Sequence, residues 1–348
     1  MNKTKLPAIF AGIGFMILIL DTKTALVGAV EGLQLCLQVL IPSLFPFMFL
    51  SIILTSALST GKIRYLSVLA RILQIPENAL YIVPISLVGG YPVGAWAVSY
   101  SVHQGHISRE TGKRMLAFCS NAGPAFIFGI GSRLFPHPKW CWALWLIHIL
   151  SALLTGYLIP ANNVDPSPEV TLREHGASNP LEKAIKNMAL VCGWVILFRI
   201  VMTYLQHWFL WLLPVWWQVV VAGILELSNG CYGLVQIEDL SIRFILCTAF
   251  LSLGGVCVAF QTFSITKGMD NSWYFPGKLL QTALSVLMGC LLISQGMRLP
   301  LALFLIIFCI AYKIFPAKRQ KGIAIRAALL YNQERMSGGN LHVVSEKD

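Results

Sequence analysis

The feature that most restricts how this chain folds is a series of apolar stretches about as long as a bilayer is thick. Of 348 residues, 56% are hydrophobic and only 12% are charged. A helix needs about 20 apolar residues to cross a membrane, and soluble domains carry roughly twice this charged fraction. We therefore expect an all-α polytopic membrane protein with about eight to ten membrane segments and no separate soluble domain.

Short polar, glycine-rich interruptions occur in the same order in each half of the chain. They cover residues 89–94 and 117–124 in the first half, and 226–230 and 249–255 in the second. Irregular backbone at membrane depth survives where it lines a cavity or a solute site, because lipid cannot satisfy its polar groups. The pattern predicts a transporter. The residues predicted to break the helices are Gly89, Gly90, Pro92, Gly94, Gly123, Pro124, Gly230, Gly254 and Gly255.

The order of the segments predicts two repeats, each with a re-entrant hairpin followed by a broken helix. We expect an N-terminal transmembrane helix (1–22), a first repeat (23–160), a cytoplasmic linker (161–180), a second repeat (181–295), a last transmembrane helix (296–316) and a basic cytoplasmic tail (317–348). The first helix should be retained, because residues 21–23 offer no small-residue cleavage site. Residues 62–74 should form an amphipathic helix at the inner interface.

The distribution of basic residues predicts the orientation in the membrane, because short cytoplasmic connections are enriched in lysine and arginine. With re-entrant hairpins and spanning broken helices, most of the charge is cytoplasmic, including Lys62, Arg64, Arg71, Arg109, Lys113, Arg114, Arg173, Lys267, Lys278, Lys318, Arg319 and Lys321. The opposite side receives Lys23, Arg133, Lys139, Arg243 and Arg298. The halves are then related by inversion, which suits alternating access. The net charge of +11 reflects this bias and not nucleic-acid binding.

Metal, disulfide and enzyme chemistry find little support in the sequence. The nine cysteines lie in or beside apolar stretches without a CxxC pair, so we expect them to pack as small apolar residues. His103 and His106 have metal-like spacing but no partner ligand nearby. The motifs HExxH, GxSxG, Walker A and GxGxxG are absent. We expect neither a cofactor nor an enzyme.

Polar residues beside the interruptions are the candidate solute ligands: Glu226, Ser228, Asn229, Asn121, Ser120, Gln261 and Tyr91. Two interpretations of Glu226 are open. In the functional one, it couples transport to H⁺ or Na⁺ or accepts a hydrogen bond from the solute. In the structural one, it caps backbone N–H groups at the break. The asparagines either bind a polar solute or adopt the left-handed conformation. Tyr91 either stacks on an aromatic solute or anchors the hairpin at the interface.

Four further positions carry specific expectations. Gly123 and Pro124 should begin the second half of a broken helix, where exposed N–H groups would stabilise an anion. Arg199 either serves as an anion ligand or, as a lone arginine near the end of a span, extends along the apolar surface toward the membrane boundary, and we expect the second. Glu31 is expected at the interface.

Four motifs resemble one known family. Residues 88–129, with Gly-Tyr-Pro-x-Gly-Ala and Phe-Cys-Ser-Asn-Ala-Gly-Pro-Ala-Phe, are similar to YlbJ-type sporulation integral membrane proteins of the nucleoside-recognition (Gate) superfamily. Residues 225–230 and the Leu-Gly-Gly-x-x-Val-x-x-Gln stretch at 253–261 resemble its second-half motifs, with Ser228 in place of the usual threonine. The resemblance extends to about residue 315.

The resemblance implies a bacterial inner-membrane protein with a fold like that of concentrative nucleoside transporters. It implies a permease for a small polar or anionic solute, namely dipicolinate during sporulation, and in a spore former a location in the outer forespore membrane. The alternatives are a nucleoside-type transporter and a non-transporting scaffold or assembly factor. The expected partners are the solute, a coupled H⁺ or Na⁺, and the lipid bilayer, with no nucleic acid.

Overall fold

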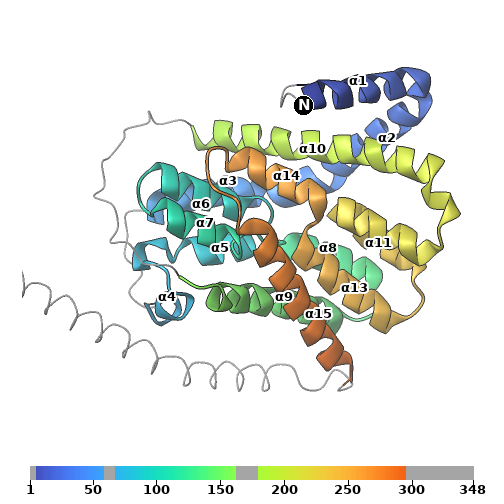
Figure 1. Cartoon of the computed structure of the whole chain (residues 1–348). Coiled ribbons are helices and arrows are strands. Elements are labelled where there is room, and N and C mark those ends of the chain that lie inside the picture. The colour runs from blue at the N-terminus through green and yellow to red at the C-terminus, as the bar shows by residue number, and fades with distance from the viewer. Residues whose placement is uncertain (1–4, 59–66, 162–178, 295–348) are drawn as a thin grey trace, which may run out of the picture. The chain divides into compact units, whose positions relative to one another are not determined.

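The computed structural model describes residues 5–58, 67–161 and 179–294, and helices are the only regular secondary structure in these ranges. Figure 1 shows the arrangement of the helices. Five helical segments among the described residues are long and apolar enough to cross a membrane: Thr22–Leu58, Pro138–Leu158, Pro180–Trp208, Leu240–Ile265 and Tyr274–Ser294. The chain is therefore a multi-pass membrane protein, as its composition predicts.

The first hairpin and the first broken helix both form. Helix α5 (Ile82–Val88) and helix α6 (Val93–His103) flank the interruption at Gly89–Pro92. Helix α7 (Arg109–Leu116) starts at Ser108, whose hydroxyl accepts a hydrogen bond from the Thr111 N–H at 3.1 Å. Helix α8 (Pro124–Leu134) begins with Pro124 directly after Gly123, where proline lacks only an N–H that the first turn leaves unpaired in any case.

The second half repeats this order of elements. Helix α11 (Val215–Leu225) and helix α12 (Leu227–Gly233) meet at Glu226. Helix α13 (Leu240–Leu253) and helix α14 (Gly255–Ile265) meet at Gly254, which has a φ of 76° that favours glycine. Gly230 does not break a helix as expected: it lies inside α12, and the interruption falls at Glu226. Gly94 lies in the first turn of α6.

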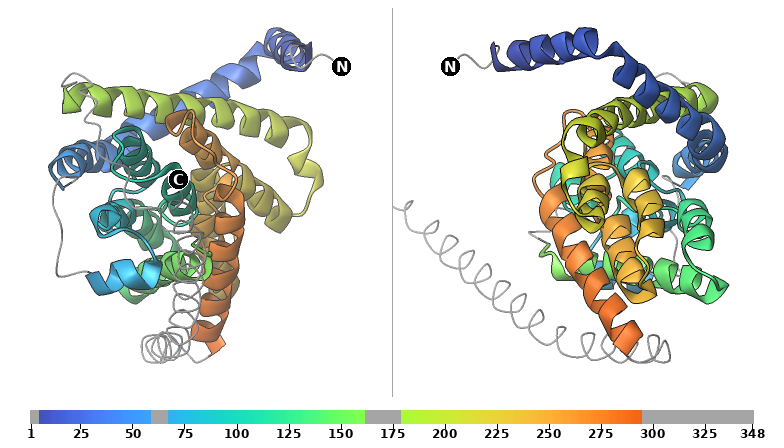
Figure 2. Two further views of the ribbon diagram at one scale, coloured as in Figure 1. Left: turned by 60° about the vertical axis from the view of Figure 1, so that its left-hand side comes forward. Right: turned by 90° about the vertical axis from the view of Figure 1, so that its right-hand side faces the viewer.

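Two long segments pack side by side at the edge of the unit, as Figures 1 and 2 show. One runs through α2 (Thr22–Leu35), a π-helical turn (Cys36–Leu40) and α3 (Ile41–Leu58). The other is α10 (Pro180–Trp208). The π turn ends two residues before Pro42, which cannot donate the hydrogen bond that a regular helix needs there. Small residues allow α2 and α10 to approach closely, because a Cβ on Gly28 would lie 2.8 Å from Ile200 Cα.

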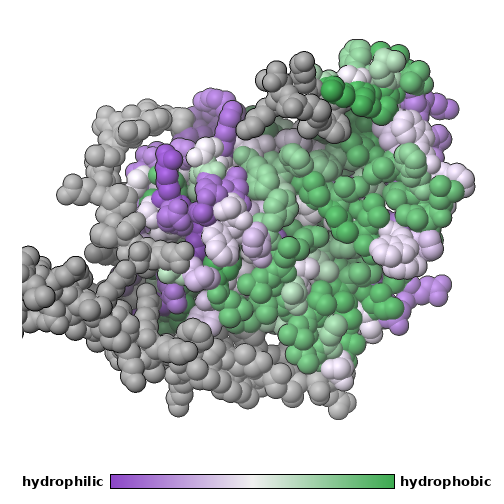
Figure 3. Space-filling view, in the orientation of Figure 1, coloured by the Kyte–Doolittle hydropathy of each residue, from purple (hydrophilic) through white to green (hydrophobic). Residues whose placement is uncertain are grey.

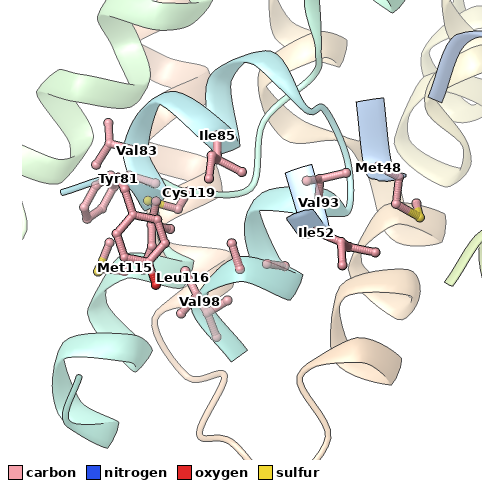
Figure 4. Packing of buried hydrophobic residues seen from close by; sticks show 14 of the residues in the cluster. Met48, Ile52, Tyr81, Val83, Ile85, Val93, Val98, Met115, Leu116 and Cys119 are labelled. Carbon is pink, nitrogen blue, oxygen red and sulfur yellow. The ribbon is translucent and has the colours of Figure 1, made fainter. Parts of the chain in front are cut away.

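The apolar core lies between α3 and the first-repeat helices. Figure 4 shows side chains that meet there from several elements, with Met48 and Ile52 on α3, Val93 and Val98 on α6, and Leu116 on α7. The core belongs to a compact unit that extends to Cys290. Burying such side chains stabilises the packing of helices that are each interrupted or short.

The outward-facing side chains are also apolar, as expected for contact with lipid. In Figure 3 hydrophobic residues cover much of the visible face, and hydrophilic residues gather toward the left, near α6 and α7. Exposed large apolar side chains include Leu26 on α2, Leu50 on α3, and Leu197 on α10. A soluble monomer rarely exposes an apolar surface this continuous.

The remaining predicted segments differ in how far the structure describes them. Helix α9 (Pro138–Leu158) and helix α15 (Tyr274–Ser294) form where apolar spans were predicted. Helix α1 (Lys5–Leu20) is apolar but shorter than the five candidate spans. Helix α4 (Ser67–Leu73) forms within the predicted interfacial helix, and residues 62–66 of that prediction lie outside the described residues. Most of the linker, the last predicted span and the tail lie outside the described residues.

Candidate functional site

The interruptions of the two halves meet in the interior. A Cβ on Gly90 would lie 3.1 Å from Gly123 N, so the α5–α6 and α7–α8 links are in backbone contact. A Cβ on Gly254 would lie 3.1 Å from the Tyr91 hydroxyl, which connects the α13–α14 link to the first hairpin. A Cβ on Gly255 would lie 3.1 Å from the Ile224 carbonyl next to the α11–α12 link. All four interruptions therefore converge, and glycine is needed because the backbones approach within van der Waals distance.

A cavity lies at this meeting point. Four predicted ligands line it, Tyr91, Glu226, Ser228 and Gln261, together with apolar side chains from α2–α3, α10 and α14. It leaves about 40 Å³ for the centres of water-sized molecules. Since one water needs about 10–15 Å³ by this measure, the cavity has room for a few waters. All seven predicted ligands are buried, although Asn121, Ser120 and Asn229 do not line the cavity.

Glu226 caps the N-terminus of α12. One carboxylate oxygen accepts a hydrogen bond from Ser228 N at 2.9 Å, and the other accepts one from Asn229 N at 2.7 Å. The side chain is buried and also faces the cavity. The structural interpretation of Glu226 is thus confirmed, but each oxygen retains a second lone pair for a ligand. The two interpretations are compatible.

Arg199 forms an inward ionic contact, so the expectation that it extends to the membrane boundary is wrong. Its Nε lies 2.9 Å and its Nη2 2.8 Å from the Glu31 carboxylate on α2. Its Nη1 donates to Asn229 Oδ1 on α12. An opposite charge and a buried amide in reach favour this geometry over an extended one. Asn229 Nδ2 is buried without a hydrogen-bond partner among the described residues.

Lys278 is the most important functional residue that the sequence interpretation missed. It was counted among the cytoplasmic charges, but it lies on α15 with its side chain only 1% exposed. Its ammonium donates to the Tyr91 hydroxyl at 3.1 Å, to Gln281 Oε1 at 2.9 Å and to the Ser120 carbonyl. A polar stripe of Lys278, Gln281 and Ser285 at helical spacing in an apolar span was the available signal.

The same network holds the first broken helix. Gln281 Nε2 donates to Asn121 Oδ1 at 3.0 Å, and Asn121 Nδ2 donates to the Phe118 carbonyl at 2.7 Å. Asn121 therefore serves the backbone of the break. The buried hydroxyls of Ser120, Thr262 and Tyr274 lie close to one another, and none of them forms a well-aligned hydrogen bond among the described residues.

His148 on α9 is a second residue that the sequence interpretation missed. Its Nε2 accepts a hydrogen bond from Ala122 N at 3.0 Å, and the ring is buried. Because Nε2 accepts, the imidazole carries no proton on that nitrogen. His148 thus satisfies a backbone N–H that the break of the α7–α8 helix would otherwise leave unpaired.

Tyr91 and Gln261 face the cavity from opposite halves. Tyr91 is buried, which disfavours its role as an interface anchor, and its hydroxyl donates to the Leu251 carbonyl at 3.0 Å. Gln261 Nε2 lies 3.3 Å from Cys257 Sγ, a weak acceptor, so its amide is free to bind a better partner. No cluster of metal-ligating side chains occurs within the described ranges.

The geometry defines an integral, multi-pass membrane protein with a buried polar site at its helix breaks. The chain is similar to the sporulation integral membrane protein YlbJ of Bacillus subtilis (strain 168), with 30% identity over 103 residues. This match covers 28% of the chain and 24% of that protein, so a resemblance over nearly the whole chain is not shown. No family model matches. No solved structure matches.

Proposed function

We propose that the chain is a secondary transporter of a small polar or anionic solute. The observation that carries the proposal is the convergence of the four helix interruptions beside one buried cavity, whose largely apolar lining includes Tyr91, Glu226, Ser228 and Gln261. Broken helices at the core of a membrane protein are costly unless their free backbone groups bind something. In transporters, such breaks supply the substrate site near the bilayer midplane.

The order of elements supports two repeats related by inversion. The hairpin α5–α6, the broken helix α7–α8 and the span α9 correspond to α11–α12, α13–α14 and α15. In this arrangement α2–α3 and α10 precede the two hairpins, and the cavity lies between the halves. Rocking of one half against the other would expose the cavity alternately to each side.

The chemistry at the cavity supports a small solute with hydrogen-bonding groups. Gly123 at the start of α8 lines the cavity, and a helix N-terminus favours an anionic group. Gln261 and Ser228 add neutral donors and acceptors, and Tyr91 offers an aromatic ring. An aromatic dicarboxylate such as dipicolinate suits the chemistry of this set, although it is larger than the cavity, which would have to widen to bind it. The name of the sporulation protein YlbJ favours the same physiological setting.

Flux in proteoliposomes tests the proposal. Wild type, Glu226→Gln and the control Glu182→Gln would be offered dipicolinate and a panel of nucleosides across proton and sodium gradients. Glu182 is a suitable control because its carboxylate is exposed and does not line the cavity. We expect gradient-dependent uptake that Glu226→Gln abolishes and Glu182→Gln preserves.

The outcome distinguishes the alternatives. Uptake of nucleosides in place of dipicolinate would assign a nucleoside-type transporter. Folded, inserted protein that neither binds nor transports any solute would overturn the proposal and favour a scaffold or assembly role in the membrane.

A further inference from the structure

The ammonium of Lys278 occupies a site made of neutral oxygen atoms from three elements. Tyr91 Oη comes from the α5–α6 link, the Ser120 carbonyl from the α7–α8 link, and Gln281 Oε1 from α15. A lysine ammonium has three N–H donors, and these three acceptors use all of them. No carboxylate among the described residues forms an ion pair with Lys278.

A monovalent cation bound between the two helix breaks would have these same three oxygen atoms as ligands. Backbone carbonyls at unwound segments coordinate the coupling ion in transporters with broken helices. The carbonyl of Ser120 is freed in the same way, because α7 ends at Leu116 and α8 begins only at Pro124. The ring of Tyr91 adds a favourable face, with Lys278 Nζ 5.0 Å from its centroid.

The position of Lys278 connects this site to the cavity. Tyr91 lines the cavity on one side and accepts the Lys278 hydrogen bond at its hydroxyl. Gln281 links the same site to Asn121 at the first break. A positive charge at this point therefore holds the first hairpin, the first broken helix and α15 together.

We propose that Lys278 is a covalently attached cation that fills the site where a free sodium ion would otherwise bind, so that the protein works without Na⁺. The part of the proposal that concerns transport rests on the proposed function, whereas the part that concerns the cation site does not. Removal of the ammonium without removal of the three oxygens should leave a site that a free cation can occupy.

Thermal unfolding of the purified full chain tests the cation site. Wild type, Lys278→Ala and the control Lys186→Ala would be compared in sodium, lithium and choline chloride at equal ionic strength. Lys186 is an exposed lysine paired with Glu182 within one helix. A cation that binds only the folded state raises the Tm. We expect the Tm of wild type and Lys186→Ala to be the same in all three salts, and that of Lys278→Ala to be lower in choline and partly restored by Na⁺ or Li⁺.

Two results would contradict the proposed cation site. One is a sodium-specific rise in the Tm of wild type, which would show a separate sodium site. The other is a folded Lys278→Ala protein that responds to no cation. If Lys278→Ala does not fold, Lys278→Gln is the second variant, because it keeps a hydrogen-bond donor without the charge. Failure of both variants to fold in any of the salts also counts against an exchangeable cation site.

Flux measurements then separate this inference from the proposed function. Wild-type uptake should persist when choline replaces sodium on both sides, and Lys278→Ala uptake should require sodium. Absence of transport for every solute, with the salt-dependent Tm of Lys278→Ala intact, would reject the proposed function and leave the cation site supported. Sodium-dependent wild-type uptake would reject the inference and leave the transporter intact.

Discussion

At the scale of single residues, Glu226 combines a structural and a cavity-facing role. Its two oxygens accept from the N–H groups of the second and third residues of α12, Ser228 and Asn229, and Ala in its place would leave both donors buried without a partner. Loss of an N-cap costs about 1–2 kcal/mol. We expect Glu226→Ala to lower the Tm clearly more than Glu226→Gln, which retains one acceptor oxygen. Equal stability of wild type and Glu226→Ala in thermal unfolding would contradict the capping role.

Arg199 and Glu31 form the second residue-scale prediction. Their side chains are 24% and 42% exposed, so the pair is only partly buried. A double-mutant cycle with Arg199→Met and Glu31→Gln should give a coupling free energy of about 1 kcal/mol at most. Arg199→Met alone should cost more than Glu31→Gln alone, because it also removes the hydrogen bond to Asn229. Equal losses for the two single variants would contradict that third contact.

At the scale of helices, the contact between α2 and α10 depends on glycine. A Cβ on Gly32 would lie 2.9 Å from Ile196 Cα, a backbone atom that cannot move alone. Forcing two helices apart typically costs 1–3 kcal/mol, on the order of a core overpacking defect. We expect Gly32→Ala to lower the Tm, whereas Gly193→Ala on α10, with open space at its Cβ, should not. A lower Tm for Gly193→Ala than for Gly32→Ala would refute the packing argument.

One ion pair, outside the predicted membrane-spanning segments, is expected to depend on pH. Lys113 on α7 lies 2.6 Å from Asp270 in the α14–α15 loop. The hydrogen bond from Lys113 lowers the pKa of Asp270 to about 2, with a contribution from Ser272. Because the folded-state pKa lies below its ordinary value of 3.8, the pair stabilises the fold above that value. This stability is lost as the pH falls from about 4 through about 2.

We expect the Tm of wild type to fall as the pH is lowered through this window, and the Tm of Asp270→Asn to fall less. Thermal unfolding in steps of pH measures it, with Glu182→Gln as the control for general acid effects. The size should be modest because the pair is exposed to solvent. Parallel curves for wild type and Asp270→Asn would show that the pair does not contribute.

The elements themselves were largely predictable from local pattern. The starts of α7 at Ser108 and of α8 at Pro124 follow from cap chemistry, and Gly254 breaks α13 from α14 as predicted. The turn of the second hairpin was predicted less accurately. The residues Ser-Asn-Gly suggested a turn, but in the structure they lie within helix α12. Glu226 provides the cap there, so the helix can begin at Leu227, two residues before Asn229.

At the scale of the whole molecule, the distribution of lysine and arginine predicts which connections face the cytoplasm. Single cysteines introduced at exposed positions, in a background without the natural cysteines, test it in sealed cells and inverted vesicles. Glu110→Cys should react with an impermeant maleimide from the cytoplasmic side. His137→Cys and Glu238→Cys should react from the opposite side. Labelling of all three from one side would refute the predicted orientation and, with it, the inverted relation of the halves.

The sequence by itself determined the membrane class, most of the helix breaks and the polar residues that line the cavity, Tyr91, Glu226, Ser228 and Gln261. Hydropathy, capping and glycine conformation are local properties, and each can be read from a few neighbouring residues. Only the tertiary structure decided that Arg199 pairs with Glu31, that His148 accepts from Ala122, and that Lys278 is buried. Lys278 and Tyr91 lie 187 positions apart, and their hydrogen bond exists because separate helix breaks converge. No local pattern encodes the distance between two such breaks, because the packing of all helices sets it.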